Sequence, residues 1–197
     1  MVDSKQWQIA QAWEKQWHDI CTNTFGEEWK QTLYARKMGL QFFHDGKSPF
    51  NIDLQGKSIV DIGGGPSSLL LKCVNGGTLL VVDPLDFPAW VRIRYEAAGI
   101  IYGQLKAEEL YVLDFDECWI YNVLQHVDDP QEVIEAARAS AYLIRIFEWI
   151  DTPVNDGHPQ SLTEEALNRW LGGEGKVEVL RNDHNCTGRC YYGVFPT

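Results

Sequence analysis

Short apolar runs alternate with stretches of helical spacing from residue 57 to the end of the chain. The runs are short enough to be buried strands, and the stretches between them have the periodicity of amphipathic helices. The expected strands are 58–62, 79–83, 99–102, 117–122, 141–148, 175–181 and 189–195, and the expected helices are 67–74, 88–98, 130–139 and 163–171.

This alternation is typical of a parallel sheet with helices on both faces. Only a loop separates the last two strands, so we expect them to pair as an antiparallel hairpin. The predicted fold is α/β, with a doubly wound, mostly parallel, seven-stranded sheet. Asp129-Pro130 predicts one helix start, because Pro suits the first turn, and Ser161 with Glu164 has the spacing of a capping box at another.

The residues before this alternating region have a helical pattern. Trp7, Ala10, Trp13 and Trp17 fall close to one helical face, and a second helix is predicted from Gly26 to Leu40. We interpret the tryptophan stripe as packing against the main domain.

The length of 197 residues is enough for one domain with a sizeable core. We expect residues 1–50 to form an N-terminal helical cap within the same domain as residues 51–197. No apolar run approaches the roughly 20 residues that span a bilayer, and the first sixteen residues lack the apolar core of a signal peptide. A cytoplasmic protein without a membrane partner is therefore expected.

The net charge of -11 limits the possible partners. Nucleic acid would be repelled, because the 17 Lys and Arg residues form no basic run. The five cysteines indicate reduced thiols. His184, Cys186 and Cys190 have the pattern H-x-C-x3-C, but a fourth zinc ligand at suitable spacing is missing, so we expect a turn and an edge strand there.

The most specific motif is the run Ile59–Ser68, in which an apolar strand with an acid, Asp61, leads into three glycines. The next apolar run ends in Asp83, 22 positions after Asp61. Glycines allow close approach of the backbone to a ligand, and an acid at the end of the second strand suits the two hydroxyls of a ribose. Together they predict a site for an adenosine-type cofactor where the loops 61–67, 83–85 and 122–129 converge.

These segments resemble the class I S-adenosylmethionine-dependent methyltransferases. Val60–Gly65 is similar to the first motif of that family, Val81–Pro84 to its second, and Tyr121–Pro130 to its fourth-strand segment. The resemblance extends over residues 58–196 and includes the final antiparallel pair.

The resemblance implies S-adenosylmethionine as the cofactor. Asp61 would orient its ammonium group, Asp83 would hold the ribose, Leu85 would pack on the adenine, and Asn122 would offer its backbone carbonyl to the ammonium. The implied cofactor residues are Asp61, Gly63, Gly64, Gly65, Ser67, Asp83, Pro84, Leu85, Ala107, Glu108, Asn122 and Val123.

The sequence departs from the family pattern in two places. Pro66, Ser67 and Ser68 stand where a third glycine is expected, although Pro still suits a helix start. Lys106 stands where many relatives have an Asp that accepts a hydrogen bond from the adenine, and a lysine cannot accept one. Glu108 could replace that acceptor.

Methyl transfer to a hydroxyl requires removal of a proton, for which histidine is the natural base. His126 and His158 are the candidate catalytic bases, and Glu148 and Asp151 are candidate substrate residues. A required Mg²⁺ is not expected, because Asp128 and Asp129 lack a third oxygen ligand at suitable spacing. The N/D-P-P-Y/F motif of nucleic-acid amino-methylating enzymes is absent.

We therefore predict a methyltransferase for a small-molecule or glycan acceptor, with transfer to oxygen, of a hydroxyl or a carboxylate, favoured. Two alternatives remain. Gly63-x-Gly65-x-x-Ser68 partly matches the dinucleotide fingerprint of a nicotinamide-dependent oxidoreductase. The second alternative is a methyltransferase-like module that binds the cofactor but has no turnover of its own. The oligomeric state and the acceptor are left open by the sequence.

Overall fold

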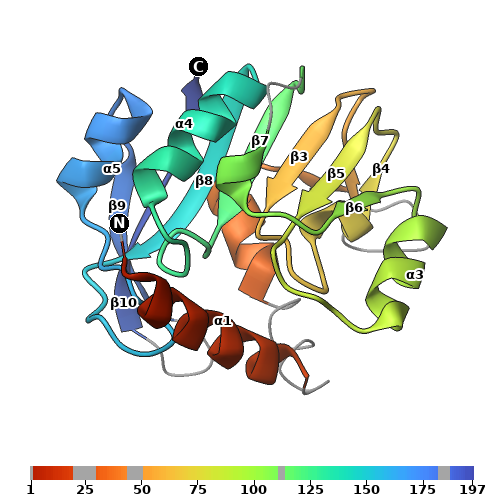
Figure 1. Ribbon diagram of the computed structural model, residues 1–197. Helices are drawn as coiled ribbons and strands as arrows, with labels where there is room; N and C mark the ends of the chain where they lie inside the picture. The colour runs from red at the N-terminus through yellow and green to blue at the C-terminus, as the bar shows by residue number, and fades with distance from the viewer. Residues whose placement is uncertain (1, 20–29, 44–50, 111–113, 182–186) are drawn as a thin grey trace.

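The computed structural model describes residues 2–19, 30–43, 51–110, 114–181 and 187–197. The central sheet orders its strands as β6 (Ile101–Gly103), β5 (Leu79–Val82), β3 (Ile59–Ile62), β7 (Glu117–Tyr121), β8 (Leu143–Ile150), β10 (Thr187–Pro196) and β9 (Lys176–Arg181) (Figure 1). The first five of these are parallel, and β10 is antiparallel to both β8 and β9. The predicted seven-stranded sheet and its terminal hairpin are confirmed.

Helices cover both faces of this sheet (Figure 1). The described helices are α1 (Ser4–His18), which crosses the carboxyl ends of the strands, residues 30–37, α3 (Ala89–Ala97), α4 (Pro130–Ser140) and α5 (Glu164–Leu171), with short 3-10 turns η1 (Leu69–Lys72) and η2 (Ala107–Glu109). Among the described helices, none has both the length and the apolar character needed to cross a bilayer.

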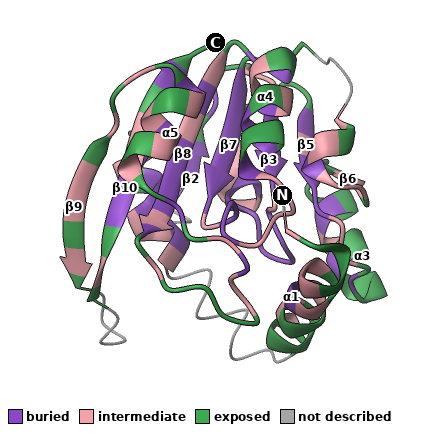
Figure 2. Cartoon of the chain, turned by 60° about the vertical axis from the view of Figure 1, so that its left-hand side comes forward, coloured by how far each residue is buried: buried purple, intermediate pink, exposed green. Residues whose placement is uncertain are grey.

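Successive side chains of the central strands enter two separate cores, because strand side chains alternate between faces. Val60 and Ile62 of β3 pack with α4 and α5, whereas Ile59 packs with the helix at 30–37, η1 and α3. Figure 2 shows β3 and β7 buried along their length and the edge strand β9 partly exposed. A strand buried on both faces explains the continuous apolar runs in the sequence.

The predicted helix 67–74 is wrong. The segment forms η1, where the Ser68 hydroxyl accepts the Leu70 N–H, and then the strand β4 (Cys73–Val74). β4 pairs with β2 (Asn51–Asp53), which also pairs with β1 (Phe42–Phe43), in a small second sheet.

Two helix boundaries also differ from expectation. The described part of the second helix, 30–37, ends before Gly39, whose φ of 77° is the left-handed conformation typical of a helix end; residues 26–29 lie outside the described residues. At α5 the N-cap is Thr163, which accepts the Ala166 N–H, and not Ser161. Asp129 and Pro130 begin α4 as predicted.

Candidate functional site

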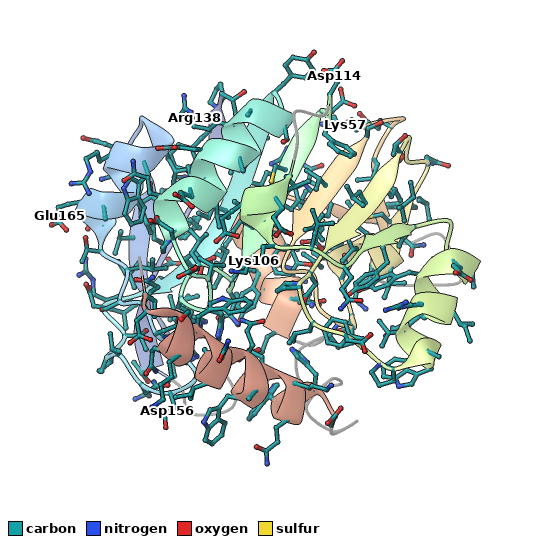
Figure 3. All side chains as sticks on the ribbon, viewed as in Figure 1. Lys57, Lys106, Asp114, Arg138, Asp156 and Glu165 are labelled. Atoms are coloured by element: carbon teal, nitrogen blue, oxygen red, sulfur yellow. The ribbon has the colours of Figure 1, made fainter. Side chains whose placement is uncertain are left out.

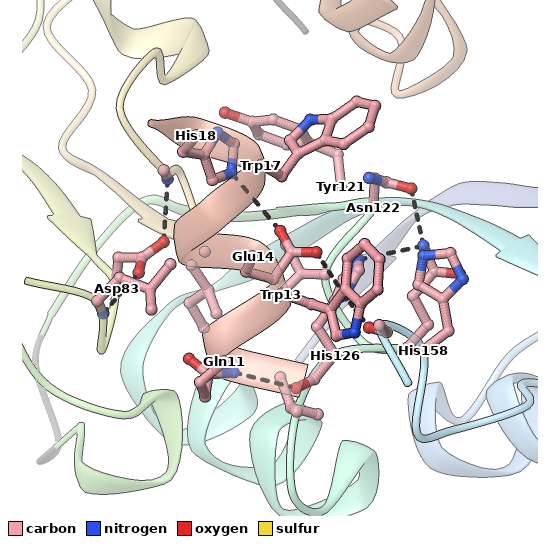
Figure 4. Close-up of a pocket in the computed structure, with 18 of the residues that line it drawn as sticks. Gln11, Trp13, Glu14, Trp17, His18, Asp83, Tyr121, Asn122, His126 and His158 are labelled. Atoms are coloured by element: carbon pink, nitrogen blue, oxygen red, sulfur yellow. Dashed lines mark hydrogen bonds and ion pairs between the residues drawn. The ribbon is translucent and has the colours of Figure 1, made fainter. Parts of the chain in front are cut away.

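A cavity of about 730 Å³ lies at the carboxyl ends of the parallel strands, on the side that α1 covers (Figures 1 and 4). The loops after β3, β5 and β7 converge there, as expected. Ten of the predicted cofactor residues line it: Gly63, Gly65, Ser67, Asp83, Pro84, Leu85, Ala107, Glu108, Asn122 and Val123. Figure 3 shows Lys106 at this end of the sheet, beside α1, and Lys57 at the opposite end.

The glycine loop needs glycine at its first position. Gly63 has a φ of 67°, and a Cβ on it would lie 2.6 Å from the side chain of Val123. Strain and a clash would therefore follow from any side chain at this position. Gly63 N–H donates to the Val82 carbonyl at 2.7 Å, which fixes the start of the loop against β5.

Asp61 lies behind this loop and is fully buried. Its Oδ2 accepts hydrogen bonds from the Ser68 hydroxyl and, at 2.5 Å, from the Tyr121 hydroxyl. Its Oδ1 is buried and has no hydrogen-bond partner among the described residues. Burial, helped by the nearby charge of Asp83, raises the pKa of Asp61 to about 7 against the effect of these hydrogen bonds.

Asp83 follows β5 and faces the cavity. Its Oδ1 accepts the Leu85 N–H at 2.9 Å, and its Oδ2 accepts the Gly65 N–H at 3.1 Å. Burial raises its pKa to about 6, although these two N–H groups and the nearby His18 favour the charged form. A carboxylate offers about four acceptor sites, so each oxygen of Asp83 keeps room for one more donor.

Lys106, which stands where many relatives have an Asp, precedes η2 on one wall of the cavity. Its ammonium lies 3.9 Å from the centre of the Trp7 ring and 3.6 Å from Asp128 Oδ2. Neighbouring Glu108 has a buried Oε1 without a hydrogen-bond partner in the described part of the chain, and burial raises its pKa. Glu108 therefore supplies a buried acceptor beside Lys106.

His126 and His158 lie side by side on the other wall, with ring centres 4.8 Å apart. Nδ1 of His126 is 2.8 Å from the Gly157 carbonyl and 3.3 Å from Glu14 Oε1, and Nε2 is 3.3 Å from Gln125 Nε2. Because the Gln125 amide nitrogen can only donate, Nε2 accepts and the proton is assigned to Nδ1. Burial, with the charge of His126, lowers the pKa of His158.

Glu14 of α1 was missed by the sequence analysis. It lies between two histidines, 3.3 Å from His126 and 3.6 Å from Nε2 of His18 (Figure 4). Burial would raise its pKa, but the charges of these imidazoles outweigh it and lower the pKa. Trp7, Gln11, Glu14 and His18 have one-face helical spacing, a signal that was available in the sequence.

The tryptophan stripe of α1 is not the core contact that we expected. Only Ala10 of this helix is buried, whereas Trp13 and Trp17 are 52% and 43% exposed and line the cavity. The helix therefore presents its aromatic rings to the cavity and to solvent.

The two predicted substrate residues lie elsewhere. Glu148 is fully buried within β8, where its carboxylate accepts the N–H groups of Val123 at 2.9 Å and Leu124 at 3.1 Å. Burial raises its pKa to about 8 against these hydrogen bonds. Asp151 pairs with Arg189 at the surface. Neither is among the described cavity-lining residues; Glu148 instead holds the loop that carries Asn122 and His126.

The described residues contain no group of three or more His, Cys, Asp or Glu side chains that could hold a metal ion. Cys190 is buried in β10, and His184 and Cys186 lie outside the described residues.

No protein-family model and no curated protein sequence matches this chain. Solved structures do. A magnesium protoporphyrin IX methyltransferase from Synechocystis PCC 6803, with bound SAM, has a TM-score of 0.58 at 14% identity, covering 88% of this chain and 81% of its own. A Burkholderia thailandensis 1,6-didemethyltoxoflavin-N1-methyltransferase, with S-adenosylhomocysteine, has 0.56 at 14% identity, covering 72% and 71%.

A SAM-dependent methyltransferase from Methanosarcina mazei has a TM-score of 0.54 at 14% identity, covering 73% of this chain and 93% of its own. The chain therefore has the fold of the class I S-adenosylmethionine-dependent methyltransferases.

Proposed function

We propose that this protein is an S-adenosylmethionine-dependent methyltransferase with a small-molecule or glycan acceptor, methylated at oxygen. The observation that carries the proposal is the pair of buried carboxylates, Asp61 and Asp83, beside a glycine loop in this fold. Neither carboxylate has a Lys or Arg partner among the described residues. A ligand that brings positive charge and hydroxyl donors would satisfy both.

The residues present fit S-adenosylmethionine. Asp61 lies behind the cavity-lining loop, and its buried Oδ1 has no partner in the described structure, so it would orient an ammonium group directly or through water. Asp83 keeps acceptor sites for two ribose hydroxyls, and Leu85 and Ala107 offer apolar surface to an adenine. Glu108 would accept from the adenine amino group in place of the acid that Lys106 replaces.

The cofactor, when bound, supplies a methyl group already activated on a sulfonium sulfur. The protein's own work is then to align the acceptor and exclude water, which can contribute several kcal/mol of barrier reduction. α1 covers the cavity and serves the second purpose. The carboxylates of Glu14, Asp83 and Glu108 give the cavity a negative field suited to a cationic ligand.

We propose His126 as the general base. With its proton on Nδ1, the ring has an unprotonated Nε2, which would accept the hydroxyl proton of the acceptor in place of its 3.3 Å contact with Gln125 Nε2. The Gly157 carbonyl and Glu14 then stabilise the imidazolium that forms, so Glu14 is a positioning residue for this base. His158, in ring contact with His126, is the second candidate.

Calorimetry of the full chain with S-adenosylhomocysteine and, separately, with NAD⁺ tests the cofactor. Binding of the first alone is expected, whereas binding of NAD⁺ alone would identify an oxidoreductase and overturn the proposal. Transfer of a labelled methyl group to a broad acceptor panel tests turnover. Tight cofactor binding with no transfer to any acceptor would favour a binding module that works through a partner.

A further inference from the structure

Four aromatic side chains outside the proposed cofactor residues line the cavity. Trp13 and Trp17 come from α1, Tyr34 from the helix at 30–37, and Trp149 from the end of β8. Tyr34 and Trp149 join the helix at 30–37 to β8. The Trp149 indole N–H donates to the Tyr34 hydroxyl at 3.4 Å, and the Tyr34 ring stacks on Phe147 of β8. The back wall is therefore fixed by core packing, while Trp13 and Trp17 are substantially exposed on α1.

Two glutamines that line the same cavity, Gln31 and Gln125, have amide oxygens without a hydrogen-bond donor among the described residues. Gln31 and Gln125 are 6% and 3% exposed, and the Oε1 atom of each has no hydrogen-bond partner among the residues that the structure describes. Gln125 uses its amide nitrogen on Asn122 Oδ1 at 3.0 Å, which fixes its oxygen as the remaining polar atom. A buried acceptor without a donor is costly, so a bound ligand with N–H or O–H groups would stabilise the site.

The charges favour a neutral or cationic acceptor over an anionic one. The described charged side chains that line the cavity are Glu14, Asp83, Glu108 and Asp156 against Lys30 and Lys106. Lys106 is already paired with Asp128 and Trp7. Arginine, the usual partner of phosphate and carboxylate groups, is not among the described lining residues.

From these three observations we infer that the acceptor is a planar aromatic molecule, neutral or cationic, with one or two O–H or N–H donors. Flat rings stack well on indole and phenol walls, and two donors match the two orphan amide oxygens. A sugar has less flat apolar surface to place against these rings and more hydroxyls to bury, each with a cost if it is left unpaired. This inference rests on the proposed function, because it assigns the acceptor of that site.

The test uses the full chain saturated with S-adenosylhomocysteine and titrated with hydroxyquinoline, hydroxyindole and naphthol, a hydroxyquinoline carboxylate and methyl glucoside. We expect at least one neutral aromatic probe to bind and the carboxylate and the glucoside to bind more weakly. Trp13→Ala and Trp17→Ala should each weaken the aromatic probe about 10-fold, since a ring contact contributes both stacking and buried area.

Matched controls separate a wall contact from a general effect. Trp90 is similarly exposed but lies on α3, and it is not among the described cavity-lining residues, so Trp90→Ala should change the affinity by less than about twofold. Gln31→Leu should weaken the probe, whereas Gln8→Leu, at an exposed position of α1, should not. Each variant should keep its affinity for S-adenosylhomocysteine.

The inference is overturned if S-adenosylhomocysteine binds but methyl glucoside binds more tightly than every aromatic probe. It is also overturned if no aromatic probe binds, or if Trp90→Ala has the same effect as Trp13→Ala and Trp17→Ala. Failure to bind S-adenosylhomocysteine would instead contradict the proposed function, and the inference with it.

Discussion

The two ends of the central sheet hold buried acids in opposite ways. At the amino end, Glu117 accepts hydrogen bonds from Arg145 Nε at 2.6 Å, Lys57 Nζ at 2.7 Å and Trp119 Nε1 at 2.9 Å. Burial alone would raise the pKa of Glu117, but these donors lower it to about 2. Arg145 also donates to the Met38 carbonyl at 2.8 Å and so ties the helix at 30–37 to this end.

At the carboxyl end, the acids have hydroxyl and backbone N–H partners instead of cations. The pKa of Asp61 is raised to about 7, that of Asp83 to about 6 and that of Glu148 to about 8, with burial as the main cause in each case. Of the four buried acids compared, only Glu117 at the amino end therefore has Lys and Arg partners among the described residues. The proposed function explains the other end as a site that a cationic ligand completes.

Glu117→Gln should have the largest effect on stability. Removing one partner of a buried ion pair leaves Arg145 without its counter-charge, which costs about 3–5 kcal/mol. Asp83→Asn, at the other end, should change the free energy of unfolding of the ligand-free protein far less, because no buried cation among the described residues loses its partner. Urea denaturation of both variants measures the difference, and equal losses would remove the contrast between the two ends.

His126→Ala should lower turnover about 10²-fold, the contribution of a general base. Its affinity for S-adenosylhomocysteine should stay nearly unchanged, because His126 is not among the residues proposed to hold the cofactor. Glu14→Gln should lower turnover less and shift the acid limb of the pH–rate profile, since it removes the charge beside Nδ1. If His126→Ala and His158→Ala both keep full turnover, neither histidine is the base.

Asp83→Ala should weaken binding of S-adenosylhomocysteine by about 2 kcal/mol, because it removes paired hydrogen bonds to a charged group. Asp86→Ala is the matched control, since Asp86 is exposed three residues later and pairs with Arg92 at the surface. Isothermal titration calorimetry gives both affinities. An Asp83→Ala protein that folds and binds as tightly as the control would exclude the ribose role.

The pH dependence of stability should have opposite signs at the two ends. The raised pKa values of Asp61 and Asp83 mean that the folded state holds these protons more tightly, so stability is lost as pH rises from about 4 to about 7. Glu117 has a lowered pKa, so its contribution is present above pH 4.5 and is lost as pH falls toward 2.

The melting temperature should therefore depend less on pH between about 4 and 7 in Asp61→Asn than in the wild type. In Glu117→Gln it should depend less on pH below about 4.5. A decline between pH 4 and 7 that persists unchanged in Asp61→Asn and in Asp83→Asn would mean that other groups cause it.

The sequence by itself determined the sheet, its order of elements and the glycine loop between Asp61 and Asp83. Those features are local: strand periodicity, helix capping at Asp129 and the backbone freedom of Gly63 act over a few residues. The same periodicity predicted the helix that contains Trp7, Ala10, Trp13 and Trp17, and it placed these residues close to one face.

Only the tertiary structure decided which part of the protein this face of α1 contacts. Docking of α1 over the carboxyl ends brings Glu14 within 3.3 Å of His126, 112 positions along the chain, and no local pattern encodes that distance. Likewise, pairing with β10 extends β8 to Ile150, beyond the predicted end at 148, and keeps Glu148 inside the sheet instead of on the substrate rim. Contacts between distant segments set both outcomes, because burial depends on the partner surface as well as on the residue.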